Sequence, residues 1–192
     1  MADVACVDLF CGAGGLTHGL ISEGIRVVAG IDVDEACRHP FEANNAARFI
    51  NEDVGRLAPK NLKELFGSAE VRVLAGCTPC QPFSTYAQRY DVVGSPRWGL
   101  LYQFGRLIKA TRPDLVTMEN VPSVAKHAVF DDFVETLAGV VGHIQRRTDL
   151  GSAATAPFPL SPFGSASVSA TEFRREKGAY GQKTSHCNNC AF

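Results

Sequence analysis

Two segments of this 192-residue chain carry side chains that could perform catalysis. Residues 76–84 read GCTPCQPFS and follow an apolar run at 71–75, so Cys80 stands between two prolines just after a predicted strand. Because proline stiffens the loop, this thiol would be presented at a fixed angle, as a nucleophile requires. Glu119 follows another predicted strand, 114–118, and is a candidate general acid. The alternatives are a buried, inert thiol and a solvated strand end.

A third segment is rich in glycine and could hold a nucleotide-like group. Residues 8–16 read DLFCGAGGL, where glycine permits a tight turn and close approach of a ligand at the start of a helix. The next predicted strand leads to Asp32, which could accept hydrogen bonds from ribose hydroxyls. Asp53 follows a third strand and could reach an adenine amino group. The turn and the acid predict a nucleoside-type cofactor; the alternative is a plain turn with exposed aspartates. The absence of a phosphate-loop lysine disfavours ATP hydrolysis.

The cysteines do not indicate a metal site. Cys77 and Cys80 have CxxC spacing, as do Cys187 and Cys190, and this spacing suggests zinc or redox chemistry. However, no histidine pair lies nearby at ligand spacing, and the prolines beside Cys80 do not suit a thioredoxin-like helix start. We therefore expect no metal. An odd number of cysteines, seven, without a signal peptide favours a reducing compartment.

Alternating strand and helix patterns position these segments. The predicted strands are residues 4–9, 27–31, 49–50, 71–75 and 114–118, and the predicted helices are 16–23, a helix capped by Asp34 and running to residue 47, 61–66, 99–111 and 131–141. This order predicts an α/β fold with a doubly wound, mostly parallel sheet and helices on both faces. Ligands of such sheets bind beyond the carboxyl ends of the strands, where all three segments lie.

The composition excludes several classes of protein. With 45% hydrophobic and 20% charged residues, the chain is expected to fold, as one domain with or without an appendage. No apolar run approaches the roughly 20 residues that a membrane span needs, so we expect no membrane partner. A net charge of −1 argues against a protein that coats nucleic acid by electrostatics alone.

Taken together, the three segments resemble the cytosine-C5 DNA methyltransferases. They occur in the family's order, each after a predicted strand, and span residues 1–142. The resemblance implies a Rossmann-like methyltransferase fold that binds S-adenosyl-L-methionine. The cofactor-binding residues it implies are Phe10, Gly12, Ala13, Gly14, Gly15, Leu16, Asp32, Val33, Asp53 and Pro79.

The resemblance also implies a reaction on double-stranded DNA. Cys80 matches the nucleophile that adds to a flipped-out cytosine, Glu119 matches the acid that binds the cytosine edge, and Gln81 and Ser84 would contact DNA. A cognate restriction endonuclease and a bacterial cytoplasmic or nucleoid location would accompany this role. Methylation of tRNA cytosine is a less favoured alternative.

The chain departs from the family pattern after residue 142. The family's Gln-x-Arg-x-Arg block is matched only in part by Gln145 and Arg147, a further candidate DNA contact. Residues 143–192 contain only four branched aliphatic residues, so we expect a poorly structured tail without a target-recognition domain, and residues 1–142 as a partial catalytic domain. Truncation or a shifted reading frame is our hypothesis. A non-catalytic cofactor-binding remnant and a nucleic-acid-binding regulator are the alternative functions.

Overall fold

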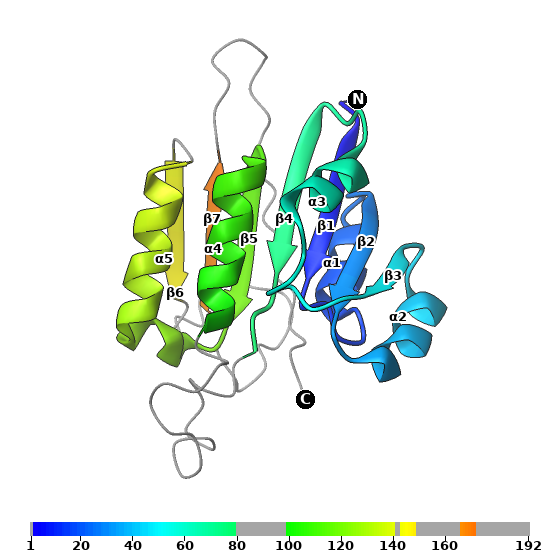
Figure 1. The fold of residues 1–192 in the computed structure, drawn as a ribbon, viewed down its shortest axis with the longest axis horizontal. Helices are drawn as coiled ribbons and strands as arrows, with labels where there is room; N and C mark the ends of the chain where they lie inside the picture. Colours follow the sequence, from blue (N-terminus) through cyan, green and yellow to red (C-terminus); the bar gives the residue numbers. More distant parts are fainter. Residues whose placement is uncertain (1, 80–98, 141–142, 149–165, 172–192) are drawn as a thin grey trace, which may run out of the picture.

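A single sheet organises the part of the chain that the computed structural model describes, which is residues 2–79, 99–140, 143–148 and 166–171. Its seven strands lie in the order β3-β2-β1-β4-β5-β7-β6. The strands are β1 (Val4–Leu9), β2 (Val27–Asp32), β3 (Arg48–Asn51), β4 (Val71–Gly76), β5 (Leu115–Asn120), β6 (His143–Thr148) and β7 (Ala166–Thr171). The first five run parallel, and β7 is antiparallel to both β5 and β6 (Figure 1).

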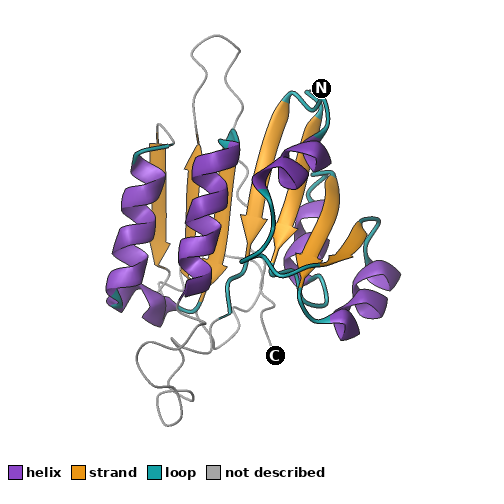
Figure 2. Cartoon of the chain, viewed as in Figure 1, coloured by secondary structure: helices purple, strands orange, loops and turns teal. Residues whose placement is uncertain are grey.

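Helices cover both faces of this sheet, as the alternating pattern predicts. They are α1 (Gly15–Ser22), α2 (Arg38–Asn44), α3 (Pro59–Phe66), α4 (Gly99–Thr111) and α5 (Ala128–Ala138), with short 3-10 turns η1 (Glu35–Cys37) and η5 (Pro122–Lys126). Leu16 and Leu20 of α1 pack against a cluster that includes Cys6 and Ala75 on one face. On the other face α3, α4 and α5 share the main core with the strands (Figure 2). The doubly wound prediction is confirmed.

Phe104 of α4 lies at the centre of the main core. It is fully buried, its ring is 5.5 Å from that of Phe133 on α5, and it meets the edge of the Phe10 ring at 6.5 Å. Gly76 at the end of β4 gives it room, because a Cβ there would lie 3.1 Å from the Phe104 ring. The helix that follows residues 80–98 is therefore packed directly against the ends of β1 and β4.

Of the five predicted helices, only 99–111 has the predicted bounds; α1 and α3 differ from the prediction by one or two residues, and the second and the last helix differ more. Asp34 caps only the turn η1, by accepting a hydrogen bond from the Ala36 N–H, and α2 then ends at Asn44 because Asn45 adopts an extended backbone. The last predicted helix begins at Ala128 rather than at residue 131. Pro59 opens α3, where its missing N–H is tolerated, and Gly67 ends it with a φ of 57°.

The tail after residue 142, which the sequence predicts to be poorly structured, contains two strands among its described residues, β6 and β7. Both belong to the same sheet as β1, since β7 pairs with β5 from Leu115↔Thr171 to Asn120↔Ala166. The physical reason is the edge of β5: its unpaired backbone groups are satisfied by β7, which needs little hydrophobic content to form a ladder. The proposed domain boundary at residue 142 stays a prediction.

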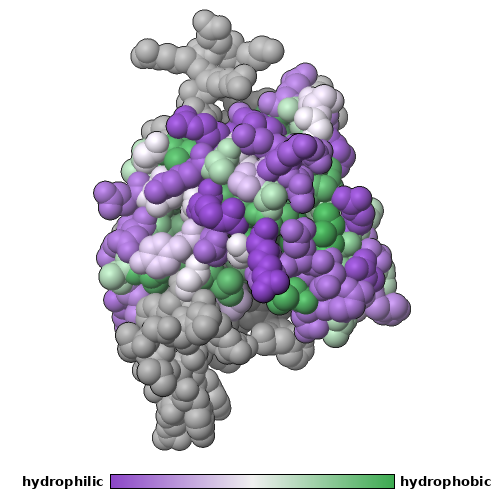
Figure 3. Space-filling model, viewed as in Figure 1, coloured by the Kyte–Doolittle hydropathy of each residue, from purple (hydrophilic) through white to green (hydrophobic). Residues whose placement is uncertain are grey.

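The surface of the described residues is mainly hydrophilic. Figure 3 shows a face on which purple, hydrophilic side chains surround smaller green areas. The large hydrophobic side chains exposed among the described residues are Val33 and Tyr102. None of the helices in this part of the chain combines the length and apolar character needed to cross a membrane.

Candidate functional site

The carboxyl ends of the parallel strands bring the sequence-predicted residues to one edge of the sheet. In register across the sheet, Asp32 of β2 pairs with Asn51 of β3, and Leu9 of β1 pairs with both Ile31 of β2 and Gly76 of β4. The segments that follow each strand therefore start side by side. This confirms that the glycine-rich turn and the strand leading to Cys80 share an edge.

The glycine-rich turn after β1 is held by hydrogen bonds to β2. The Cys11 N–H donates to the Ile31 carbonyl at 3.2 Å, and the Gly12 N–H donates to Oδ2 of Asp32 at 2.9 Å. Phe10 has a φ of 58°, in the left-handed region that non-glycine residues seldom adopt, and Gly12 follows with 51°. The chain thus reverses within a few residues and directs α1 away from the sheet edge.

Gly14 is required by packing as well as by backbone conformation. Its φ is 93°, and a Cβ at this position would lie 2.3 Å from Nδ2 of Asn45 and 2.8 Å from the Phe41 ring. The same phenylalanine would meet a Cβ on Gly30 at 2.4 Å. Phe41 of α2 therefore fills the space that two glycines leave open, and this fixes α2 against the turn.

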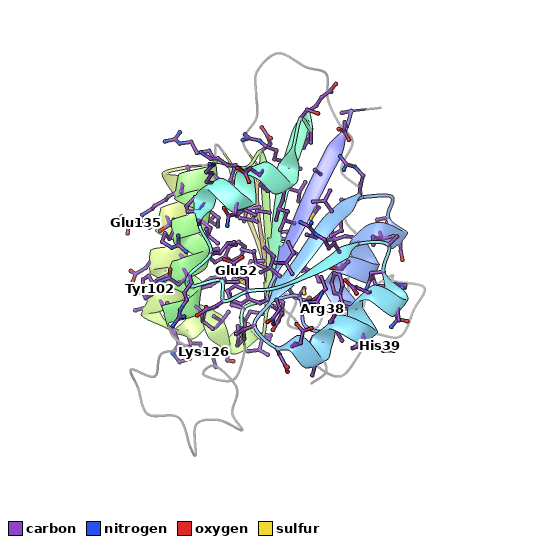
Figure 4. All side chains as sticks on the ribbon, turned by 45° about the vertical axis from the view of Figure 1, so that its right-hand side comes forward. Arg38, His39, Glu52, Tyr102, Lys126 and Glu135 are labelled. Carbon is purple, nitrogen blue, oxygen red and sulfur yellow. The ribbon has the colours of Figure 1, made fainter. Side chains whose placement is uncertain are left out.

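Arg38 secures α2 to the neighbouring strand. Its guanidinium donates to the Phe49 carbonyl of β3 at 3.2 Å, lies over the Phe49 ring at 5.0 Å from the centroid, and pairs with Glu35. Figure 4 labels Arg38 beside His39 on α2. The pairing with Glu35 lowers the pKa of that carboxyl, and this ion pair holds η1 and α2 together just after Asp32.

Asp32 uses both carboxylate oxygens to organise the backbone around it. Oδ2 accepts from Gly12, and Oδ1 accepts from the Asp34 N–H at 2.9 Å. The side-chain amide of Asn51 donates to the carbonyls of Asp32 and Val33 at 3.2 and 2.9 Å. The side chain of Val33 is left 70% exposed beyond the strand. An apolar surface and an acid with spare lone pairs thus lie together.

The glycine-rich turn leaves backbone groups open at this edge of the sheet. A Cβ added to Gly12 would meet no atom within 4 Å, so the backbone there faces open space. Ala13 and Gly15 are exposed, whereas Leu16 is partly buried against the α1 core. An exposed backbone, the Asp32 carboxylate and the apolar Val33 side chain are groups that could hold a nucleoside-type cofactor.

Asp53 lies in the segment between β3 and α3. Its Oδ1 accepts a hydrogen bond from the Gly55 N–H at 2.8 Å, and its Oδ2 is 3.8 Å from Nε of Arg56. Its side chain is 46% exposed, so one face of the carboxylate remains open to a ligand. The segment also receives three hydrogen bonds from Arg106 of α4, to the carbonyls of Val54, Gly55 and Leu57.

Asp8 is a fully buried acid directly below the turn. Its Oδ2 accepts a 2.7 Å hydrogen bond from the Thr17 hydroxyl, and its Oδ1 has no hydrogen-bond partner. Burial raises the pKa of Asp8 to about 7, the Thr17 hydrogen bond opposes this, and the charges of Asp32 and Glu119 raise it further. Asp8 therefore lies within electrostatic reach of both predicted site acids and holds a proton near neutral pH.

The buried thiols in the described residues are not nucleophiles. Burial raises the pKa of both Cys6 and Cys11 far above the ordinary range, so they stay protonated. The side chains of Cys77 and Cys37 are partly exposed. Among the residues that the structure describes, no group of three or more His, Cys, Asp or Glu side chains is placed to hold a metal. Cys80 lies outside the described residues.

The described residues beside Cys80 are held rigidly. The Cys77 N–H donates to the Leu9 carbonyl at 3.2 Å, continuing the pairing of β4 with β1. The amide of Asn120, at the end of β5, donates to the carbonyl and to Oγ1 of Thr78 at 2.9 and 2.8 Å. Both residues are buried. The loop therefore leaves the sheet at Pro79 from a fixed position beside Glu119. Gln81 and Ser84 lie outside the described residues.

Arg147 of β6 shares a register position with Glu119. Glu119 pairs with Ser167 of β7, which pairs in turn with Arg147. The backbone of the candidate DNA contact is thus level with the candidate acid, two strands away. The sequence did not predict this alignment, because residues 143–148 were expected to be poorly structured and instead form β6.

Sequence reasoning missed three residues that organise this site. Asn51 connects β3 to the carbonyls around Val33, Thr17 supplies the hydrogen bond to Asp8, and Arg106 holds the Asp53 segment. Asn51 directly precedes the loop that carries Asp53, a position that could have indicated a role. Arg106 has no such signal, because its partners are carbonyls about fifty residues away.

Comparisons with known proteins agree with this geometry. Residues 4–141 match the family model described as C-5 cytosine-specific DNA methylase. The chain is similar to the type II methylase M.HgiDII of Herpetosiphon aurantiacus, with 42% identity over 143 residues that cover 73% of this chain and 40% of the relative. It is also similar to the type II methyltransferase M.AgeI of Thalassovita gelatinovora, with 33% identity, 67% of this chain and 31% of the relative covered. The chain thus spans less than half the length of either relative.

Solved structures show the same fold. The Entamoeba histolytica methyltransferase EhMeth matches with a TM-score of 0.70 and 18% identity, covering 96% of this chain and 58% of its own. The S. pombe Dnmt2 methyltransferase matches with a TM-score of 0.67 and 17% identity, covering 92% and 51%. The predicted Rossmann-like methyltransferase fold is confirmed. Because the family model covers well over half of the sequence, the chain belongs to the C-5 cytosine-specific DNA methylase family.

Proposed function

We propose that this chain is the cofactor-binding and catalytic part of a DNA cytosine-C5 methyltransferase. It would transfer a methyl group from S-adenosyl-L-methionine to C5 of a cytosine in double-stranded DNA. One observation supports this above the others: the Asp32 carboxylate is bonded to the Gly12 backbone, and Glu119 lies on the same sheet edge. A cofactor site and an acid for the target base would then share one sheet edge, with β1 and β4 between them.

The residues of the turn and the strand ends would hold the cofactor. Asp32 would accept hydrogen bonds from the ribose hydroxyls, since each of its oxygens keeps a lone pair beyond its backbone contact. Val33, 70% exposed, would pack on the adenine, and Asp53 would accept from the adenine amino group. The glycine-rich turn from Phe10 to Leu16 would border the remaining groups, with Pro79 opposite. When bound, S-adenosylmethionine supplies the methyl group.

Catalysis would require activation of the cytosine ring. The thiolate of Cys80 would add to C6, which places carbanion character on C5. Glu119 would hold a proton at N3 and stabilise the charge that the addition creates. C5 would then take the methyl group of S-adenosylmethionine, which leaves S-adenosylhomocysteine, and loss of the C5 proton to a base with elimination would free Cys80. Because a stacked base offers no access to C6, the cytosine must be flipped out, with Gln81, Ser84 and Arg147 as DNA contacts.

The cellular partners follow from the same proposal. M.HgiDII and M.AgeI are named type II enzymes, which favours a role beside a cognate restriction endonuclease. The place of action would be a bacterial cytoplasm or nucleoid, where the DNA substrate lies.

The test is transfer of a labelled methyl group by the full chain. The purified protein is incubated with labelled S-adenosylmethionine and unmethylated genomic DNA, and the digest is analysed for 5-methylcytosine. We expect label in 5-methylcytosine that disappears in Cys80→Ala and persists in Cys190→Ala, which removes a thiol that the proposal does not use. Cofactor binding without transfer would favour a non-catalytic cofactor-binding protein instead. DNA binding that ignores the cofactor would favour a regulator, and label in tRNA would redirect the substrate.

A further inference from the structure

The segment that carries Asp53 accepts hydrogen bonds from an arginine that is distant in the sequence. After β3 the chain crosses in front of the sheet toward α4 before it turns into α3 (Figure 1). Its internal hydrogen bonds run from Gly55 to the Asp53 side chain and from the Arg56 and Leu57 N–H groups to the Asp53 carbonyl. These bonds fix the shape of the turn. The Glu52 N–H donates to the Asp32 carbonyl at 3.0 Å, and the side chains of Val54 and Leu57 are buried in the main core, but none of these hydrogen bonds connects the turn to α4.

Arg106 provides the connection to α4. Its Nη2 donates to the carbonyls of Val54 and Leu57, both at 3.1 Å, and to that of Gly55 at 3.5 Å, while Nε donates to Gln103 on the same helix at 2.7 Å. In the described part of the chain, Arg106 forms no ion pair with a carboxylate. Its guanidinium therefore donates to neutral oxygens, three backbone carbonyls and the Gln103 side chain, a use that the five fixed donors of a guanidinium allow.

Helix α4 connects this segment to two other parts of the candidate site. It begins at Gly99, directly after the residues that include Cys80, and Phe104 packs edge-on against Phe10 of the glycine-rich turn. Only two positions separate Phe104 from Arg106. Figure 4 shows Glu52, the residue before Asp53, between Tyr102 of α4 and Arg38 of α2. One helix thus contacts both the turn and the Asp53 segment.

We propose that Arg106 is a positioning residue that holds Asp53 in place for the adenine amino group of S-adenosylmethionine. This inference rests on the proposed function. Without the hydrogen bonds from Arg106, the Asp53 turn would be less ordered between its anchors at Glu52, Val54 and Leu57, and ordering it again on binding would reduce affinity. The effect should be specific to the purine amino group, since Asp32 and Val33 are held by other contacts.

The experiment measures cofactor affinity by titration calorimetry on the full chain. We expect Arg106→Met to raise the Kd for S-adenosylmethionine by about tenfold, because hydrogen bonds from a charged donor are lost. Arg106→Lys has one compact ammonium for the three carbonyls, so its Kd should lie between that of the unaltered chain and that of Arg106→Met. Lys109→Met, an exposed position on the same helix, should leave the Kd unchanged.

A double-mutant cycle separates positioning from a general loss of structure. Asp53→Asn alone should weaken binding, and Arg106→Met should add little in that background, because both act on the same contact. A cofactor analogue with hypoxanthine in place of adenine lacks the amino group, so Arg106→Met should change its Kd little as well. Additive effects in the cycle, or an equal loss for both cofactors, would overturn the inference.

The two proposals fail in different ways. If the unaltered chain does not bind S-adenosylmethionine, the proposed function is wrong. If it binds and Arg106→Met binds equally well, only the role of Arg106 is wrong. If Arg106→Met does not fold, Arg106→Lys provides the test. An unchanged Kd together with an unchanged preference for adenine over hypoxanthine would refute the inference. A reduced preference for adenine would support it.

Discussion

The carboxylate of Asp32 accepts a 2.9 Å hydrogen bond from the backbone N–H of Gly12, a residue twenty positions earlier in the chain. This bond joins the turn after β1 to the end of β2, where the second carboxylate oxygen binds the Asp34 N–H. Two motifs that the sequence presents separately are therefore one structural unit. A change at Asp32 should affect the glycine-rich turn as well as any ribose contact.

Asp32→Asn should weaken cofactor binding strongly, whereas Asp34→Asn should not. An asparagine at 32 has one oxygen for two backbone N–H groups, so its amide would face a donor. We expect the Kd for S-adenosylmethionine to rise by about tenfold or more. At Asp34 the side chain only caps η1, a role that asparagine fills equally well. Calorimetry on the two variants measures the difference, and equal affinities would refute the role given to Asp32.

Gly14→Ala should destabilise the protein far more than Gly24→Ala. Both glycines have positive φ values, 93° and 80°, but only at Gly14 would a Cβ collide with Asn45 and Phe41. Strain and overpacking together should lower the free energy of unfolding by about 2–5 kcal/mol at Gly14, against about 1–2 kcal/mol from strain alone at Gly24. Urea denaturation of both variants tests this. A similar loss in the two would show that Phe41 does not pack as described.

Asp8 should make stability depend on pH between about 4 and 7. Burial raises its folded pKa to about 7, so the folded state keeps a proton that the unfolded state releases from about pH 4 upward. The free energy of unfolding then falls as the pH rises through this window, by about 2–4 kcal/mol in total, and levels off above it. Asp8→Asn cannot ionise, so its melting temperature should change less between pH 5 and pH 7.5. A variant with the full pH dependence of the unaltered chain would contradict this account.

Asn120→Ala should reduce methyl transfer without changing cofactor affinity. The amide of Asn120 holds both oxygens of Thr78, just before Cys80, and is far from the Asp32 end of the sheet edge. Thr78→Val removes only one of these acceptors and should give a smaller loss of kcat. Kinetics of the two variants measures kcat, and calorimetry measures the Kd for S-adenosylmethionine. A rise in this Kd along with the loss of transfer would contradict the separate role given to Asn120.

The parallel part of the fold was predictable from the sequence because its signals are local. Runs of Val, Ile and Leu mark β1, β2, β4 and β5, and glycine or polar residues end each run. Residues 166–171 read ASVSAT and also alternate with period two, but their small side chains give a weak hydrophobic signal. Their pairing with β5 is a tertiary effect, which composition does not report.

The candidate site was predictable where one residue type implies one kind of chemistry. Asp32 and Glu119 were found because an acid at the carboxyl end of a parallel strand faces a ligand. The supporting residues were not found. Thr17 acts through one hydrogen bond to Asp8, and Arg106 acts through hydrogen bonds to three backbone carbonyls. Such contacts exist only once the chain has folded. Gly14 was assigned to the cofactor, whereas its neighbours show that Phe41 also requires it.

The central claim is that Cys80 attacks cytosine, and trapping that bond tests it most directly. DNA amplified with 5-fluorodeoxycytidine carries a C5 fluorine that a base cannot remove, so elimination is blocked and the thiol adduct persists. The chain is incubated with this DNA and S-adenosylmethionine, digested with nuclease and protease, and examined by mass spectrometry. We predict a methylated fluorocytosine nucleotide attached at Cys80 and none in Cys80→Ala. A chain that binds both cofactor and DNA, yet forms no adduct at Cys80, would contradict the account.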